Sequence, residues 1–486
     1  MTFYVTTAIP YVNAPPHLGH ALELVQADLL ARHRRARGEA VRFLTGTDDN
    51  ALKNVTAARA AGIPVEAFVG ANADRFAALR EPLELSFDDF LRTGSDPRHA
   101  PGVTALWRRS APDFYRHSYT GLYCPGCEQF LDSTGCPEHP AAPEPVAETN
   151  WFFRLSRYQR QILEALESGR VRVEPAARRN EVLAFVRAGL RDISVSRPAA
   201  RADGWGIPVP GDPTQIVYVW WDALANYVTA LGDGDDLRTW WLEAERVHVI
   251  GKGIVRFHAV HWLALLLSAG LPLPTTILVH DYLTVDGAKL AKSAGNAVDP
   301  VALTDRYGVD ALRWWLLSEV APVGDTDFTV ERLVARADRD LANGIGNLVN
   351  RALTLAHRHG GVRPATVACD LPARVDAALH AGDFRAATGA VWAEVDRGNR
   401  LIEAAQPWKL AEPGPVLAEV LGICGVLADE LRPFLPSGAE RLRARLRSDG
   451  PPRPVFPRVG AAASETVRPA RPTTPPPPWT GLKAGR

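Results

Sequence analysis

The sequence has little cysteine, almost no methionine and no excess of charge of either sign. Its 486 residues include 5 cysteines, and Met1 is the only methionine. Five cysteines in a chain of this length are too few for a disulfide-stabilised extracellular scaffold. Lysine plus arginine and aspartate plus glutamate both number 55. Because the whole molecule has no net charge, a nucleic-acid partner would have to be bound by local basic patches.

Long apolar segments are also missing. The sequence contains no apolar run of about 18 residues, the length that a membrane-spanning helix requires. The N-terminus does not have the basic segment followed by an apolar one that marks a secretion signal. We therefore expect a soluble, cytoplasmic protein with no membrane partner. The chain is long enough for two to four domains with substantial cores.

The N-terminal segment has the pattern of a strand, a proline-rich turn and an amphipathic helix. Residues 3–7 are a β-type run, and Pro15 and Pro16 precede the helical pattern, where proline is tolerated. His17 and His20 share one face of the first helical turn, with Gly19 between them. Unpaired amides, the positive end of the helix dipole and two imidazoles would suit a phosphate chain. The alternative is a helix start with two surface or metal-binding histidines.

A second basic element is the segment 286–296, DGAKLAKSAGN. It places Lys289 and Lys292 three residues apart in a small, glycine-flanked loop. Lysine is a compact charge on a flexible stem, which suits a highly charged leaving group such as pyrophosphate. Taken alone, such a run is more often an ordinary solvated loop.

Four potential metal ligands lie in a turn-rich stretch that begins near residue 121. Cys124 and Cys127 form one x-x spaced pair, and Cys136 and His139 form a second pair. Three thiolates and one imidazole make the tetrahedral set of a structural zinc site. A closed set of four ligands leaves no open coordination position, so we expect the ion to support folding. Unrelated cysteines beside a surface histidine are the alternative.

Strand and helix patterns alternate through much of the chain. Apolar runs at 40–44, 247–250 and 276–279 predict buried strands, helical patterns lie around 51–61 and 65–79, and 217–224 is strand-like before a helical 225–227. Asp48 and Asp49 follow a strand directly, and sites in parallel α/β sheets lie at the carboxyl ends of strands. From about residue 330 to 446 the spacing predicts a helical bundle interrupted at Pro407 and Pro433. The tail, with prolines at 475–478, has the composition of a disordered or polyproline segment.

Together, the tetrapeptide 17–20 and the lysine loop resemble the two signatures of class I aminoacyl-tRNA synthetases. The surrounding sequence, from about Phe3 to about Leu446, resembles the methionyl-tRNA synthetase family. The resemblance implies an α/β fold: a Rossmann-type parallel sheet split by a zinc-knuckle insertion and followed by an α-helical anticodon-binding bundle. The expected domains are the first catalytic half (1–115), the insertion (116–200), the second catalytic half (201–325), the bundle (326–446) and a proline-rich disordered tail (447–486).

The resemblance also implies an activity and its site residues. The expected reaction is ATP-dependent activation of methionine to methionyl-adenylate, followed by transfer to the 3′ end of tRNA for methionine. Mg²⁺ accompanies the ATP, the zinc is structural, and the protein is expected to be a monomer. The ATP-binding residues implied are His17, Gly19, His20, Glu23, Lys289, Lys292 and Ser293, of which His17, His20, Lys289 and Lys292 are catalytic. The amino-acid pocket implied is Ala8, Ile9, Tyr11, Asp48, Trp220, Leu224, Tyr227 and His280. The anticodon-binding residues implied are Asn347, Arg351, Pro407 and Trp408, and the zinc ligands are Cys124, Cys127, Cys136 and His139.

Three departures from the family pattern fall at the expected active site. Asn50 and Ala51 stand where the family has a His-Gly pair, and Gly253 stands where relatives have an aspartate near the nucleotide ribose. Asp281 replaces a glycine, which would place a charge near an apolar pocket. Loss of a charged hydrogen bond at residue 253 would weaken ATP binding by roughly 1–3 kcal/mol.

Two alternatives to a methionine–tRNA ligase stay open at this stage. The first is a paralogue that activates a different amino acid, or that serves as a drug-tolerant or biosynthetic second copy. The second is a non-catalytic tRNA-binding protein that kept the scaffold. The retained His17, His20, Lys289 and Lys292 favour an active enzyme.

Overall fold

The central element of the fold is a six-stranded parallel sheet. The computed structural model describes residues 2–124, 129–131, 135, 142–290, 297–448 and 453–460. The strand order is β3-β2-β1-β12-β13-β7, and every neighbouring pair is parallel. The strands are β1 (Thr2–Thr7), β2 (Ala40–Thr47), β3 (Asp89–Arg92), β12 (Glu245–Gly251), β13 (Thr276–His280) and β7 (Arg172–Glu174). The order reverses between β1 and β12, and ligands of such sheets bind outside the carboxyl ends at that point.

Helices cover the sheet and connect its strands. α1 (Leu18–Ala36) crosses from β1 to β2, and α2 (Leu52–Ala61), α3 (Val65–Ala77) and α4 (His99–Arg109) follow the next two strands. The face of α1 that carries Leu18, Leu22, Val25 and Leu29 is buried, as the helical spacing predicts. The strands and helices predicted at 3–7, 40–44, 51–61, 65–79, 247–250 and 276–279 are confirmed in type.

One sequence-based assignment was wrong. The segment 217–224 was expected to be a strand, but β11 (Asp212–Val217) ends where the prediction began, and α7 occupies Val219–Thr229. The run is apolar because almost all of α7 is buried, including Val219, Trp221 and Leu224. A short buried helix cannot be told from a buried strand by periodicity when nearly every position is apolar.

The insertion between the two halves of the sheet forms an antiparallel sheet of its own. Its strand order is β5-β4-β6-β8, from β4 (Phe114–Cys124), β5 (Gln129–Leu131), β6 (Glu144–Phe153) and β8 (Ile193–Ser194). A three-stranded sheet, β10 (Pro208–Val209), β11 and β9 (Ser196–Pro198), lies next to it in the chain. The segment expected to be entirely insertion also contributes α5 (Gln159–Glu167), α6 (Ala176–Arg187) and β7. Because β7 pairs with β13, this segment also forms one edge of the main sheet.

After the sheet, the chain returns in a small strand cluster and then becomes helical. The cluster has the order β15-β14-β16, from β14 (Leu283–Val285), β15 (Ala288–Lys289) and β16 (Thr326–Asp327). The helices are α10 (Pro300–Tyr307), α11 (Val309–Ser318), α12 (Val330–Arg336), α13 (Asn347–Arg358), α14 (Leu371–His380), α15 (Phe384–Ala405), α16 (Gly414–Glu430) and α17 (Pro436–Leu446), whereas α9 (Leu263–Ala269) lies earlier, between β12 and β13. A π-helical stretch, Ala337–Gly346, joins α12 to α13.

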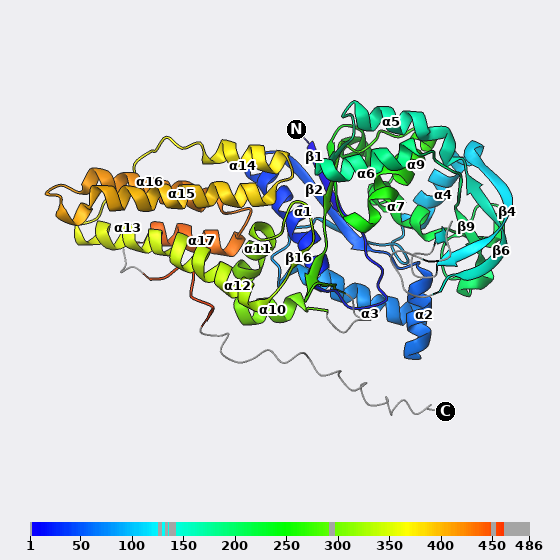
Figure 1. Cartoon of the computed structure of the whole chain (residues 1–486), viewed down its shortest axis with the longest axis horizontal. Coiled ribbons are helices and arrows are strands. Elements are labelled where there is room, and N and C mark those ends of the chain that lie inside the picture. Colours follow the sequence, from blue (N-terminus) through cyan, green and yellow to red (C-terminus); the bar gives the residue numbers. More distant parts are fainter. Residues whose placement is uncertain are drawn as a thin grey trace.

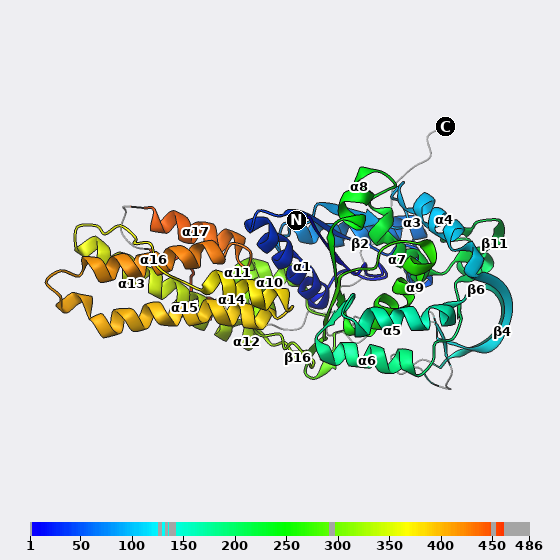
Figure 2. The same ribbon diagram turned by 90° about the horizontal axis from the view of Figure 1, so that it is seen from above.

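The bundle and the insertion lie at opposite ends of the molecule. In Figures 1 and 2 the bundle extends away from the sheet on one side, and β4 and β6 form the far edge on the other. Arg313 of α11 is fully buried and donates both to Asp28 of α1 and to the Phe434 carbonyl of the bundle, each at 2.8 Å, so it ties the bundle to the half that contains the main sheet. Residues 453–460 also pack on the bundle, where Val455 and Phe456 are buried. That part of the tail therefore differs from the disordered segment expected, and 461–486 lie outside the described residues.

Candidate active site

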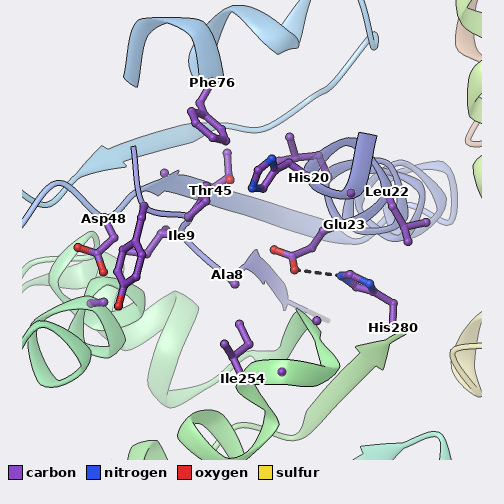
Figure 3. A pocket seen from close by; sticks show the side chains of 18 of the residues that line it. Ala8, Ile9, His20, Leu22, Glu23, Thr45, Asp48, Phe76, Ile254 and His280 are labelled. Carbon is purple, nitrogen blue, oxygen red and sulfur yellow. Dashed lines mark hydrogen bonds and ion pairs between the residues drawn. The ribbon is translucent and has the colours of Figure 1, made fainter. Parts of the chain in front are cut away.

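A cavity of about 320 Å³ lies at the carboxyl ends of the central strands. Its walls come from the segments that follow β1, β2, β12 and β13, together with the start of α1 and part of α7. Figure 3 shows side chains from these segments converging on one space. The cavity is lined by most of the residues that the sequence predicts for ATP and amino-acid binding, namely Ala8, Ile9, Tyr11, His17, Gly19, His20, Glu23, Asp48, Trp220, Leu224, Tyr227 and His280.

The start of α1 presents two stacked imidazoles to this cavity. The rings of His17 and His20 lie 3.9 Å apart between centroids, and the edge of Phe76 on α3 packs against His20. The Gly19 amide donates to His17 Nδ1, and the His17 amide donates to His20 Nδ1, both at 3.1 Å. This mutual capping fixes the orientation of both rings.

The expectation of unpaired amides at this helix start was wrong. The Leu18 amide donates to the Val298 carbonyl at 2.9 Å, and the Gly19 amide donates to the His17 ring. A Cβ on Gly19 would lie 2.9 Å from His17 Cε1, so the absent side chain makes room for that ring. The imidazoles, rather than the backbone, are therefore the groups that this helix start offers to an anion.

The opposite end of the cavity is apolar and aromatic. Trp220 stacks on Phe257 with ring centroids 3.6 Å apart, and Tyr227 is 1% exposed. The Tyr227 hydroxyl lies 2.7 Å from His258 Nε2, and His258 Nδ1 lies 3.0 Å from the Ile254 carbonyl. A carbonyl oxygen can only accept, so Nδ1 carries a proton, and in the neutral ring Nε2 then accepts from the tyrosine hydroxyl. Burial lowers the pKa of His258 to about 4, which agrees with this assignment.

A carboxylate borders the aromatic end. Asp48 is 2% exposed and follows β2, and its backbone pairs with Tyr11 through a parallel bridge. The Asn54 side chain donates to the carbonyls of Asp48 and Asp49, each at 2.9 Å. These bonds hold the turn after β2 in place, so the Asp48 side chain is presented to the cavity from a fixed backbone.

The departure at Asn50 belongs to a buried polar network behind this wall. Its Nδ2 donates to Asp222 Oδ2 at 2.6 Å, and the other oxygen of Asp222 is bonded to His99 Nε2. His99 Nδ1 in turn lies 2.7 Å from the Thr229 hydroxyl. The amide of Asn50 therefore supplies a hydrogen bond that a buried carboxylate requires.

Glu23 and His280 face each other across the third side of the cavity. Glu23 Oε2 lies 3.1 Å from His280 Nε2, a pair that Figure 3 draws as a dashed line. Burial raises the pKa of Glu23 above its usual range, although the hydrogen bond from His280 opposes the shift. His280 Nδ1 lies 2.9 Å from the Asp281 carbonyl, which sets the orientation of the ring.

Asp281 lines the cavity, as expected of a charge near the pocket, but the structure pairs this charge with a cation. Its carboxylate accepts from Arg178 of α6 at 2.6 Å and from the Gly324 amide. Asp281 is 1% exposed, so this ion pair is buried. It connects α6 to the segment after β13, next to His280.

The lysine loop is described only in part. Lys289 is the last residue of β15, whose backbone pairs with Thr284 of β14, and Lys292 and Ser293 lie outside the described residues. Leu290 is buried and lines the cavity. The segment that leads into the lysine loop therefore borders the cavity beside Leu283.

The predicted zinc set also falls largely outside the described residues. Cys124 is buried at the end of β4 and pairs in register with Gln129 of β5, whereas Cys127, Cys136 and His139 are not described. Within the described ranges, one other group of potential ligands comes together, Cys369, Asp370 and Glu394. Glu394 is already paired with Arg374 and Arg397, and two guanidinium groups make this cluster unfavourable for a cation.

The predicted anticodon residues lie on the bundle, far along the chain from the cavity. Asn347 and Arg351 are one turn apart on α13, and Arg351 Nη1 donates to Asn399 of α15 at 3.2 Å. α15 ends at Ala405, shortly before Pro407 and Trp408. Trp408 is 52% exposed, which excludes the alternative of a buried bundle tryptophan.

Sequence reasoning missed several residues of the cavity wall. Ile254, His258, Tyr282 and Leu283 all line it, as does Phe76 from α3. Ile254, Tyr282 and Leu283 lie within three residues of the ends of β12 and β13, so the rule that sites lie at strand ends would have found them, whereas His258 lies in the helical stretch that follows β12. Phe76 sits in an ordinary amphipathic helix, and no sequence signal distinguishes it from core.

Comparisons with known proteins identify relatives of this chain. The family model described as "tRNA synthetases class I (M)" matches residues 3–142 and 132–353. The methionine–tRNA ligase of Brucella suis biovar 1 (strain 1330) is 39% identical over 474 residues, covering 90% of each chain. The enzyme of that name from Mycobacterium tuberculosis (strain CDC 1551 / Oshkosh) is 38% identical over 480 residues, covering 90% of this chain and 91% of the relative.

A solved structure is similar over nearly the whole chain. The structure of Mycobacterium tuberculosis methionyl-tRNA synthetase in complex with methionyl-adenylate superposes with a TM-score of 0.85 at 36% identity. The match covers 94% of this chain and 100% of that chain.

In the part of this chain that the structure describes, no helix is long and apolar enough to cross a membrane.

Proposed function

This chain belongs to the methionyl-tRNA synthetase family of class I tRNA synthetases, and from that premise we propose that it is a methionine–tRNA ligase. It activates methionine with ATP to methionyl-adenylate and pyrophosphate, and then transfers the methionyl group to the 3′ end of tRNA for methionine. One observation carries the proposal: a single cavity joins the imidazole-bearing start of α1 to an aromatic end bordered by Asp48.

The activation step depends on positioning and charge stabilisation. The methionine carboxylate attacks the α-phosphorus of ATP, the bond to pyrophosphate breaks, and pyrophosphate leaves. We assign the contacts to the triphosphate to His17 and His20, with Lys289, Lys292 and Ser293 reaching it from the lysine loop. Mg²⁺, when bound with the nucleotide, would neutralise further phosphate charge. Gly19 and Glu23 complete the ATP-binding side.

The aromatic end is assigned to the methionine side chain. A thioether is apolar and polarisable, and it packs favourably against aromatic rings. Ala8, Ile9, Tyr11, Trp220, Leu224, Tyr227 and His280 supply that surface, to which we add Ile254 and His258. Asp48 pairs with the ammonium group of the amino acid. The buried Tyr227–His258 hydrogen bond keeps the wall neutral, which suits a side chain without charge.

The remaining assignments concern the tRNA and the zinc. We assign the anticodon contacts to Asn347, Arg351, Pro407 and Trp408, since exposed aromatic planes stack on unpaired bases and Asn and Arg reach base edges. Cys124, Cys127, Cys136 and His139 would hold a structural zinc ion that stabilises the β4–β5 end of the insertion. The buried position of Cys124 at a strand end fits such a ligand. We further propose a cytoplasmic monomer.

The proposal is tested by ATP–pyrophosphate exchange with methionine and with a panel of other amino acids, followed by charging of tRNA. We expect exchange with methionine and charging of tRNA for methionine. Exchange with a different amino acid alone would identify a paralogue with altered specificity. Absence of exchange with every amino acid, combined with retained tRNA binding, would identify a non-catalytic tRNA-binding protein. Zinc content, measured on the purified protein with and without chelator, tests the metal assignment separately.

A further inference from the structure

The loops that follow β12 and β13 meet at the side of the cavity occupied by Glu23 and His280. Gly253 comes from the first loop and Tyr282 from the second, and both line the cavity. A Cβ built on Gly253 would overlap the hydroxyl oxygen of Tyr282. The phenol hydroxyl therefore occupies the space that a side chain at residue 253 would take.

The surroundings of Tyr282 hold its ring in this position. Lys252 Nζ lies 4.8 Å from the ring centroid, on the loop that also carries Gly253. Asp325 Oδ1 accepts from Lys252 Nζ at 2.6 Å and from the Tyr282 amide at 3.0 Å. One carboxylate thus fixes both the backbone of Tyr282 and the ammonium group that covers its ring. A side chain anchored in this way binds a ligand without losing much conformational freedom.

The flanking residues give the loop two further anchors. His280 contacts Glu23 on α1, and Asp281 is bonded to Arg178 and Gly324. Three consecutive residues are therefore held by three different parts of the fold. The hydroxyl of Tyr282 is placed by the tertiary structure and not by its own loop alone.

The chemistry of the other walls indicates which part of a ligand reaches this side. The aromatic end beside Asp48 suits the amino acid, and the start of α1 suits the phosphates. The sugar and base of the nucleotide then face Glu23, Gly253 and Tyr282. A phenol hydroxyl both donates and accepts hydrogen bonds, as does a sugar hydroxyl.

We propose that Tyr282 is a nucleotide-positioning residue whose hydroxyl bonds to a ribose hydroxyl of ATP, in the space left by the missing side chain of Gly253. This inference rests on the proposed function for the identity of the nucleotide. The contact comes from the loop after β13, because the hydroxyl of Tyr282 occupies the position that a side chain at residue 253 would take.

The test combines Tyr282→Phe with ATP analogues. Affinity for ATP, 2′-deoxy-ATP and 3′-deoxy-ATP is measured by calorimetry on the full chain, alongside KM values in ATP–pyrophosphate exchange. We expect Tyr282→Phe to weaken ATP binding roughly 3- to 10-fold, the scale of one neutral hydrogen bond, and to leave KM for methionine unchanged. The wild type should bind one of the two deoxy analogues more weakly than ATP, by a similar factor. Tyr282→Phe should bind that same analogue with the affinity that it has for ATP. The inference would be overturned if Tyr282→Phe bound ATP as tightly as the wild type. It would also be overturned if, for both analogues, the loss of affinity from the substitution and the loss from the missing hydroxyl multiplied.

Two further variants separate this contact from a general structural effect. Gly253→Ala should displace the ring and reproduce the loss of ATP affinity, and wild-type affinity in this variant would count against the proposal. Tyr115→Phe removes a hydroxyl that bonds to Asp192 at 2.9 Å in the insertion, and it should bind ATP as the wild type does. If calorimetry shows the coupling but no amino acid supports exchange, the proposed function fails while the contact to ATP stands. If the protein does not bind ATP, both are wrong.

Discussion

The cavity that we propose as the active site and the bundle residues that we propose for anticodon binding differ in how far their side chains are exposed. In the cavity, Asp48 and Tyr227 are 2% and 1% exposed, and the polar groups around them are bonded to one another. On the bundle, Trp408 is 52% exposed and Asn347 is also exposed. Groups that stabilise developing charge act best when they are fixed and shielded from water. Groups that stack on RNA bases stay accessible until the partner covers them. The two regions should therefore respond differently to substitution.

The largest effect is expected at the start of α1. His20→Ala should lower the rate of methionine-dependent ATP–pyrophosphate exchange by about 10²- to 10³-fold, because removing one preorganised group aimed at developing charge has this cost. The substitution also removes the acceptor of the His17 amide. Steady-state exchange kinetics measure the effect, with a thermal melt to confirm folding. A loss below tenfold in a folded variant would remove His20 from the catalytic assignment.

Asp48→Asn tests the amino-acid end with nearly unchanged volume. We expect KM for methionine to rise roughly 10- to 100-fold, the scale of a lost charge-assisted hydrogen bond, while KM for ATP changes little. Exchange assays with each substrate varied in turn separate the two values. An increase confined to KM for ATP would show that Asp48 faces the nucleotide instead.

Trp408→Ala tests the bundle without touching the cavity. We expect kcat/KM for tRNA to fall roughly 5- to 100-fold, since one base–aromatic stack contributes about 1–3 kcal/mol, and exchange without tRNA to stay at the wild-type rate. Trp408→Phe should recover part of the loss. Leu410→Ala is the matched control, because Leu410 is a nearby apolar residue that is 41% exposed. Equal losses in both alanine variants would indicate a nonspecific surface effect.

The smallest effect that we expect near neutral pH is a change in folding stability caused by histidines packed in the half of the molecule that contains the cavity. The pKa of His258 is lowered to about 4 by burial, from an unfolded value near 6.5. As the pH falls, the unfolded chain therefore binds the proton first. The contribution of His258 to the free energy of unfolding is fully present above about pH 6.5 and is lost as the pH drops towards 4. His248 and His261 act in the same direction. Asp49, whose pKa is raised to about 6, opposes them, because its protonation stabilises the folded state.

Thermal melts at pH 7.5, 6.5, 5.5 and 4.5 measure this dependence. We expect little change between pH 7.5 and 6.5, and a decline below that. His258→Gln should make the decline shallower, whatever its effect on stability at pH 7.5. An unchanged slope would mean that the protonation of His258 does not limit the stability of the cavity half.

Local sequence patterns determined much of this protein. Strand-turn-helix spacing predicted β1, α1 and the position of His17 and His20, because hydrophobic periodicity and proline placement are local properties. The polar residues after β2 were found from the rule for parallel sheets, and the helical bundle from its long periodic run. The identity of the amino-acid wall came from resemblance to a family, since a buried tryptophan or tyrosine looks the same in any core.

Only the tertiary structure decided how these pieces complete one another. At the start of α1 the Gly19 amide donates to the His17 ring, Asp281 is paired with Arg178, and the hydroxyl of Tyr282 occupies the space beside Gly253. Each of these joins residues far apart in the chain, or depends on which way a side chain turns. The sequence shows which residues are charged and which positions lack a side chain. Which groups they contact depends on the packing of elements that meet only in the folded molecule.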